Sequence, residues 1–132
     1  MVDDHAVVRE GLKYILGEAP DLEIAAEARC VPEALELIRT QHFDVILLDL
    51  SLPGPSGMEL LRMVKANMPS LLVLIVTAYT EDQCATQVLK AGADGFISKA
   101  QVSESLLVAV WQIVSGKQYF CATLANDATQ DR

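Results

Sequence analysis

Residues 44–53 read Asp-Val-Ile-Leu-Leu-Asp-Leu-Ser-Leu-Pro, and they carry the clearest structural signal in the chain. Val45 to Leu48 form a continuous apolar run, which is typical of a short strand buried on both faces of a parallel sheet. Asp49 follows this run directly. A carboxylate at the end of a buried strand is costly without a partner. The stretch therefore predicts a buried strand with a functional acid at its carboxyl end.

Strand and helix patterns alternate along the rest of the chain. Helical patterns occur in five stretches, residues 5–16, 32–39, 56–67, 80–91 and 103–115. Strand patterns occur at residues 22–28, 71–76 and 95–98, and the first of these alternates with acidic residues as in a strand with one exposed face. Five β-α units predict an α/β fold with a parallel sheet and helices on both faces.

The first strand of this pattern is short. Only Met1 and Val2 precede the acidic pair Asp3 and Asp4, whereas a strand in a sheet usually has about five residues. We therefore expect that the first strand is truncated, either as a genuine stub or because the start of the natural protein has been cut.

Composition narrows the classes of function. A chain of 132 residues fits one domain, and its 52% hydrophobic and 21% charged residues exclude disorder. The net charge of −8 argues against nucleic-acid binding by this chain itself, because a DNA-binding surface needs Lys and Arg to replace phosphate counterions.

Cysteine usage and hydropathy indicate the cellular compartment in which the protein resides. Cys30, Cys84 and Cys121 are odd in number and lack CxxC spacing, so we expect reduced thiols rather than disulfides or a zinc site. The N-terminus lacks the pattern of a signal peptide, and the longest apolar run, residues 71–76, is too short to cross a bilayer. These features predict a cytoplasmic protein with no membrane partner.

Polar residues follow the predicted strands. Asp3 and Asp4 follow the first strand, and Asp49, Thr77 and Lys99 end three later ones. The carboxyl ends of parallel strands are where open α/β sheets bind ligands. Crowded carboxylates favour a hard divalent cation such as Mg²⁺. With an added lysine and hydroxyl, the cluster suits a dianionic phosphoryl group.

This constellation resembles the receiver domains of bacterial two-component response regulators, from Met1 to Phe120. The resemblance is carried by Asp3-Asp4-His5, by residues 44–53, and by Gly57, Val76-Thr77-Ala78 and Lys99. The separations also match: 45 residues from Asp4 to Asp49, then 28 to Thr77 and 22 to Lys99. The resemblance implies a flavodoxin-like doubly wound (βα)5 sandwich with sheet order 2-1-3-4-5. It also implies that residues 1–120 form the receiver and that 121–132 begin a disordered linker.

The resemblance implies a role for each site residue. Asp49 would be the phosphoacceptor, phosphorylated by a histidine kinase. Mg²⁺ would be bound by Asp4, by Asp49 and by the backbone carbonyl of Ser51, with Asp3 acting through water. Thr77 and Lys99 would contact the phosphoryl oxygens, and the aromatic ring of Phe96 would reorient when Thr77 moves. Such a domain is a signalling module, not an enzyme, although it promotes its own phosphorylation and slow dephosphorylation.

The first and last helices narrow the resemblance. Val7-Val8-Arg9-Glu10-Gly11-Leu12 and the segment from Trp111 to Phe120 are similar to regulators that carry a C-terminal LuxR-type helix-turn-helix. This implies a parent transcription factor that dimerises on phosphorylation and binds DNA through another domain. The alternative is a stand-alone receiver that acts by binding another protein. A phosphohydrolase is disfavoured, because such enzymes need an acid two residues after the nucleophile, where Ser51 stands.

Each site residue also has a purely structural interpretation. Asp4 could cap the first helix, in addition to any metal role. Thr77 could be a turn residue, Lys99 a solvated surface lysine and Phe96 a core residue. Taken singly these interpretations are stronger, but the order and spacing of the whole set favour the phosphoacceptor site.

Overall fold

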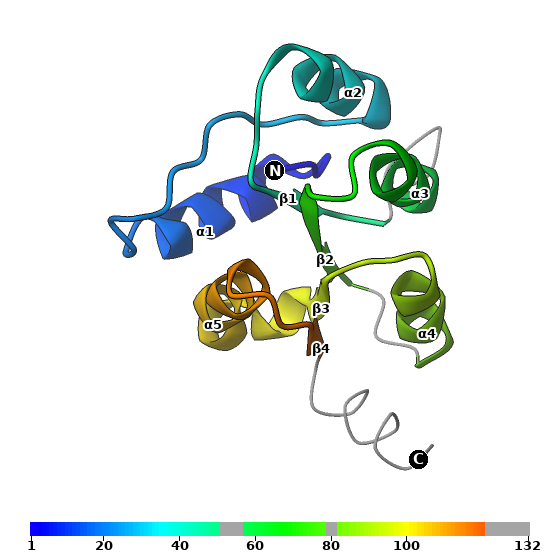
Figure 1. Cartoon of the computed structure of the whole chain (residues 1–132). Coiled ribbons are helices and arrows are strands. Elements are labelled where there is room, and N and C mark those ends of the chain that lie inside the picture. Colours follow the sequence, from blue (N-terminus) through cyan, green and yellow to red (C-terminus); the bar gives the residue numbers. More distant parts are fainter. Residues whose placement is uncertain (51–56, 79–81, 121–132) are drawn as a thin grey trace.

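The structure is a computed structural model that describes residues 1–50, 57–78 and 82–120 (Figure 1). Its centre is a parallel sheet of four strands in sequence order: β1 (Val45–Leu48), β2 (Leu72–Thr77), β3 (Gly95–Ser98) and β4 (Tyr119–Phe120). β1, β2 and β3 lie at or within one residue of the predicted positions. The continuous apolar runs are explained by burial, because nearly every residue of these three strands is buried.

Helices cover both faces of this sheet, as Figure 1 shows. α1 (Ala6–Leu16) and α5 (Val102–Val114) lie on one face. α2 (Val31–Thr40), α3 (Gly57–Asn67) and α4 (Asp82–Lys90) lie on the other. A short 3₁₀ helix, η1 (Lys99–Gln101), joins β3 to α5. This is the predicted doubly wound α/β sandwich.

The strands divide their side chains between two hydrophobic cores. Successive strand residues point to opposite faces, so Leu47, Leu74, Val76 and Ile97 pack with α1 and α5. Their neighbours Ile46, Leu48, Val73, Ile75 and Phe96 pack with the helices of the opposite face. One sheet thereby buries two apolar layers.

In the described chain the first strand is reduced to a one-residue stub, in agreement with the expectation that it is truncated. Val2 alone forms parallel bridges, to Ala28 on one side and to Leu48 on the other. The Val2 amide donates to the Leu47 carbonyl at 2.7 Å, and the Asp3 amide donates to the Ala28 carbonyl at 3.0 Å. Ala28 stands in the position of the second strand and Val2 in that of the first, while β1, β2 and β3 are the third, fourth and fifth strands. The strand order is therefore 2-1-3-4-5, in agreement with the expected topology.

The predicted strand over residues 22–28 is largely wrong. Only Ala28 is bridged, although exposure still alternates along the segment. Of the residues described, only Met1 and Val2 lie alongside the segment: Val2 is bridged to Ala28, and the Met1 amino group donates to the Ala26 carbonyl at 3.3 Å. Residues 22–26 instead border a groove of about 1010 Å³, lined also by Val45, Leu47 and Trp111.

β4 is an element that the sequence pattern did not indicate. Tyr119 and Phe120 extend the sheet beyond β3, with Phe120 in register with Phe96. Gly116, at φ +96°, makes the turn that follows α5. The sheet therefore has a sixth position, occupied by two residues.

Two expectations from the sequence concern the cysteines and the absence of a membrane span. Cys30 is a free thiol, whereas the side chains of Cys84 and Cys121 lie outside the described part of the chain. Within the described ranges, no helix combines the length and apolarity needed to cross a membrane.

Candidate functional site

Buried polar residues gather where the parallel strands end. Asp3 follows the stub, Asp49 follows β1, and Thr77 is the last residue of β2. Their exposed fractions are 2%, 1% and 0%, so all three are removed from solvent in an otherwise apolar sheet. Asp49 comes to this edge because the four residues before it are held in the core. The carboxyl edge of the sheet therefore carries a buried polar site.

Lys99 joins two of these carboxylates. Its Nζ atom lies 3.1 Å from Oδ2 of Asp3 and 3.1 Å from Oδ2 of Asp49. Burial alone would lower the pKa of Lys99, but hydrogen bonds to Asp3 and Asp49 outweigh it and raise that pKa. The lysine is therefore held in its charged form between two acids that lie far apart in sequence.

The acids also form a group able to hold a metal ion. Ligand atoms of Asp3, Asp4, His5 and Asp49 all lie within 4.8 Å of one another. Three of the four donors are carboxylates, the oxygen ligands that Mg²⁺ prefers. Asp4 is partly exposed while Asp3 and Asp49 are buried, so a cation could keep water on its outer side. The donor set fits the magnesium ion that the sequence predicts.

His5 also belongs to this group, although sequence reasoning gave it no role beyond its place in the Asp3-Asp4-His5 motif. Its Nδ1 atom lies 3.0 Å from Oδ1 of Asp4 and 3.3 Å from Oδ1 of Asp3. The ring is mostly exposed. Its adjacency to Asp4 in the sequence was the available signal.

The first helix is not capped by Asp4, although a capping role was the structural interpretation of this residue. α1 begins after His5, which makes no side-chain capping hydrogen bond. Asp3, not Asp4, takes the neighbouring backbone donor: its Oδ1 atom accepts from the His5 amide at 2.8 Å. The cap prediction for Asp4 is therefore wrong, because the helix starts one residue later than that role requires.

The other residues predicted for the site are Thr77, Phe96 and Ser51. Thr77 is paired in register with Ser98, the residue before Lys99. Phe96 is 1% exposed and belongs to the core on the α4 side of the sheet. Ser51, predicted to offer its carbonyl, lies outside the described residues.

Gly57 lies against the backbone of the acidic site. A Cβ atom at this position would be 2.5 Å from the Asp49 carbonyl oxygen and 2.9 Å from the Leu50 Cα atom. No side chain fits at such distances without backbone movement. α3 therefore begins with glycine so that it can pack directly on the chain that carries Asp49.

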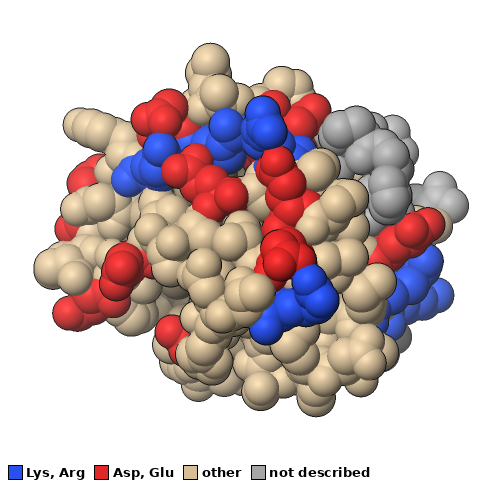
Figure 2. All heavy atoms as spheres, turned by 90° about the horizontal axis from the view of Figure 1, so that it is seen from above, with Lys and Arg blue, Asp and Glu red and all other residues tan. Residues whose placement is uncertain are grey.

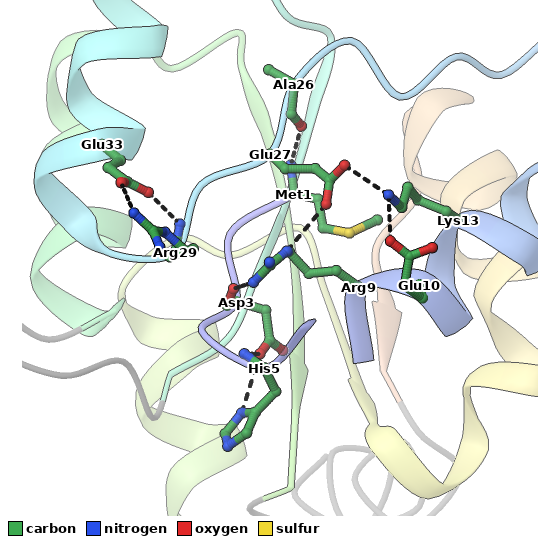
Figure 3. A network of polar contacts seen from close by, with 10 residues as sticks. All are labelled: Met1, Asp3, His5, Arg9, Glu10, Lys13, Ala26, Glu27, Arg29 and Glu33. Carbon is green, nitrogen blue, oxygen red and sulfur yellow. Dashed lines mark hydrogen bonds and ion pairs between the residues drawn. The ribbon is translucent and has the colours of Figure 1, made fainter. Parts of the chain in front are cut away.

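A polar network behind Asp3 was not predicted (Figure 3). Arg9 on α1 donates from Nη1 to the Asp3 carbonyl at 2.7 Å and from Nε to Oε1 of Glu27 at 3.1 Å. Lys13 contacts the other oxygen of Glu27 at 3.0 Å and Glu10 at 2.7 Å. The network ties the start of α1 to the extended segment that precedes Ala28.

Opposite charges are mixed on the surface. In the view of Figure 2, Lys and Arg side chains lie beside acidic ones. Arg29 and Glu33, for example, pair at 3.1 Å. Together with the net charge of −8, the mixed charges of this face give no support to DNA binding there.

Comparison with known proteins identifies the family of the chain. Residues 1–111 match the family of response regulator receiver domains. The chain belongs to this family. It is 32% identical over 126 residues to the response regulator UvrY of Escherichia coli strain K12, covering 96% of this chain and 58% of that protein. It is 39% identical over 117 residues to the DNA-binding transcriptional activator DevR/DosR of Mycobacterium tuberculosis, covering 89% of this chain and 54% of that protein.

Solved structures support the same receiver fold. A two-component response regulator of the LuxR family from Aurantimonas sp. SI85-9A1 has a TM-score of 0.91 and 31% identity, covering 99% of this chain and 94% of that one. The isolated receiver domain of RcsB from Salmonella enterica serovar Typhimurium, at 22% identity, has a TM-score of 0.88 and covers 95% and 93%. These comparisons confirm the resemblance to the LuxR-type branch. The receiver spans little more than half the length of the curated relatives named above.

Proposed function

We propose that this receiver accepts a phosphoryl group on Asp49 from a phosphohistidine of a sensor histidine kinase. The observation that carries the proposal is the buried Asp49 carboxylate, held 3.1 Å from Lys99 in a group of potential cation ligands. Asp4, Asp49 and the Ser51 carbonyl would hold Mg²⁺, with Asp3 acting through water. When bound, the ion would supply positive charge to the transferring phosphoryl oxygens.

The residues of this chain would perform the transfer as follows. A carboxylate oxygen of Asp49 bonds to phosphorus, and the N–P bond of the phosphohistidine breaks, with its electron pair returning to the imidazole. Lys99 leaves its carboxylate contacts to bind a phosphoryl oxygen, where charge develops in the transition state. The same site then slowly hydrolyses the acyl phosphate.

Phosphorylation would be read out through Thr77 and Phe96. The added negative charge attracts the Thr77 hydroxyl, and Phe96 follows on the α4 side of the sheet. This biases a two-state equilibrium of the surface formed by α4, β3 and α5. The expected consequence is a homodimer formed through a helical face.

The parent protein is proposed to be a cytoplasmic transcription regulator. Residues 1–120 would be its receiver domain, and residues 121–132 the start of a linker. The likeness to a DNA-binding transcriptional activator supports this proposal, and DNA would be bound only by a further domain. A stand-alone receiver that acts through protein contacts is the alternative, and the full reading frame discriminates the two.

Acetyl phosphate labelling tests the phosphoacceptor. In the presence of Mg²⁺, mass spectrometry should show one added phosphoryl group on the unaltered chain and none on Asp49→Asn. Asp44→Asn is the matched control, because Asp44 is an exposed carboxylate at the opposite end of β1 and should leave labelling intact. Equal labelling of Asp49→Asn and the unaltered chain would refute the proposal.

A further inference from the structure

The peptide that joins Asp3 to Asp4 lies just beyond the sheet ladder. The first strand has one bridged residue, Val2, and the last ladder bond on this side runs from the Asp3 amide to the Ala28 carbonyl. The next carbonyl, that of Asp3, accepts instead from Arg9 at 2.7 Å. An arginine side chain thus continues the hydrogen bonding that a longer strand pair would provide.

The Arg9 guanidinium is itself fixed in orientation. Its Nε atom donates to Glu27 at 3.1 Å, and its side chain is only 14% exposed. Glu27 immediately precedes Ala28, the bridge partner of Val2. Because a guanidinium is planar, the Glu27 contact determines where Nη1 points. Figure 3 shows this bridge from Glu27 through Arg9 to Asp3.

Glu27 is suited to hold this position as an anion. Its pKa is lowered chiefly by a hydrogen bond from Lys13, with Arg9 contributing and desolvation opposing. The charged form therefore persists at neutral pH, and Arg9 keeps its partner.

Fixing the Asp3 carbonyl restrains the peptide from which Asp4 extends. The Asp3 side chain is set by Lys99 and by the His5 amide, whereas Asp4 is partly exposed on the far side of the same peptide. Rotation of that peptide would move Asp4 relative to Asp49. Groups that orient metal ligands in this way affect how tightly the metal is bound.

We propose that Arg9, oriented by Glu27, is a positioning residue that holds the Asp3–Asp4 peptide and thereby sets the affinity of the acidic site for a divalent cation. This inference rests on the proposed function, since it assumes that Mg²⁺ binds at Asp4 and Asp49. Arg9 acts through the backbone and touches neither the cation nor the phosphoryl group.

Calorimetric titration with Mg²⁺ tests the inference by direct binding. Arg9→Gln should raise the Mg²⁺ dissociation constant about tenfold, as loss of a residue that orients metal ligands does elsewhere. Glu27→Gln should raise it by a smaller factor, and the double variant should bind no more weakly than Arg9→Gln. Labelling by acetyl phosphate should slow at low Mg²⁺ and return to the unaltered rate at saturating Mg²⁺.

Arg29→Gln is the matched control, because the Arg29 side chain is exposed and pairs with Glu33 instead of the Asp3 carbonyl. It should leave Mg²⁺ binding unchanged. If Arg9→Gln does not fold, Arg9→Lys and Glu27→Gln carry the test, since lysine cannot contact Glu27 and the Asp3 carbonyl with the same fork geometry. A dissociation constant within about twofold of the unaltered chain in the folded variants would overturn the inference. Failure of the unaltered chain to bind Mg²⁺ would instead overturn the proposed function.

Discussion

The Nζ atom of Lys99 lies 3.1 Å from Oδ2 of Asp49, although the two residues are 50 positions apart in the chain. Lys99 begins η1 after β3, and Asp49 follows β1, so the contact spans the end of β2. The positive charge is therefore in place before any phosphoryl group arrives. Removing the charge of Lys99 should therefore lower the stability of the domain as well as change the chemistry of the site.

Lys99→Met should lower the free energy of unfolding by about 3 kcal/mol in EDTA, because it leaves the buried Asp3 and Asp49 carboxylates without their cationic partner. Excess Mg²⁺ should restore part of the loss by supplying positive charge at the same carboxylates. Urea unfolding followed by circular dichroism, with EDTA and with Mg²⁺, measures both effects. Equal stability of the variant and the unaltered chain in EDTA would contradict this account of the site.

Magnesium should stabilise the folded domain. At ten times its dissociation constant the gain should be about 1.4 kcal/mol, because only the folded chain assembles the ligands. Asp4→Asn should raise the stability of the metal-free domain by relieving repulsion among the acids, and should weaken the response to Mg²⁺. Thermal unfolding across a Mg²⁺ titration checks both changes, and a midpoint that never moves would exclude the site.

Gly57→Ala and Gly11→Ala should have opposite effects. A methyl group at Gly57 collides with the Asp49 carbonyl, so this variant should lose about 1–3 kcal/mol and label more slowly with acetyl phosphate. Gly11 lies within α1 with nothing within 4 Å of the added carbon, so alanine there should gain up to about 1 kcal/mol. Chemical denaturation of the pair measures the contrast, and a neutral Gly57→Ala would show that α3 can move away.

Glu27 should give the domain an acid-sensitive contribution to stability. Its pKa is lowered from the ordinary value of 4.5, first by Lys13 and then also by Arg9. A depressed carboxyl pKa stabilises the fold above the unfolded value, and this contribution disappears as pH falls through the folded value. The unaltered chain should therefore exceed Glu27→Gln in stability at pH 6, with the difference shrinking below about pH 4.5. A difference that does not change between pH 6 and pH 3 would contradict the assignment.

The acidic site was predictable because strand ends can be located from one-dimensional signals. Asp49 follows four apolar residues, and Lys99 follows a strand bounded by Gly95. Parallel strands bring such ends to one edge whatever the details of packing. The sequence could therefore bring these residues together without any distance being known.

The errors in the predicted strands concern pairing. Residues 22–28 have an alternating pattern, yet a strand needs a neighbour, and the stub at Val2 pairs only with Ala28 on this side. β4 was missed for the opposite reason: two residues are too few to show a period, and Tyr119 and Phe120 pair because β3 has an open edge. Both outcomes depend on which strand lies next to the segment, and local sequence patterns do not specify the neighbouring strand.

The Arg9 network was beyond the reach of the sequence for a related reason. Arg9 and Glu27 are 18 positions apart, and they meet only because Ala28 is bridged to Val2. Many acidic residues were equally plausible partners for this arginine. Register decides such a contact.

β4 determines how a mechanical pull on the following chain would enter the domain. Phe120 runs parallel to β3 and is in register with Phe96, so tension applied beyond Phe120 loads this ladder in shear. Only two register pairs resist that load, and therefore β4 would detach before the three inner strands slip. Until it detaches, force applied to the chain beyond Phe120 is transmitted through this two-residue ladder to the backbone of Phe96.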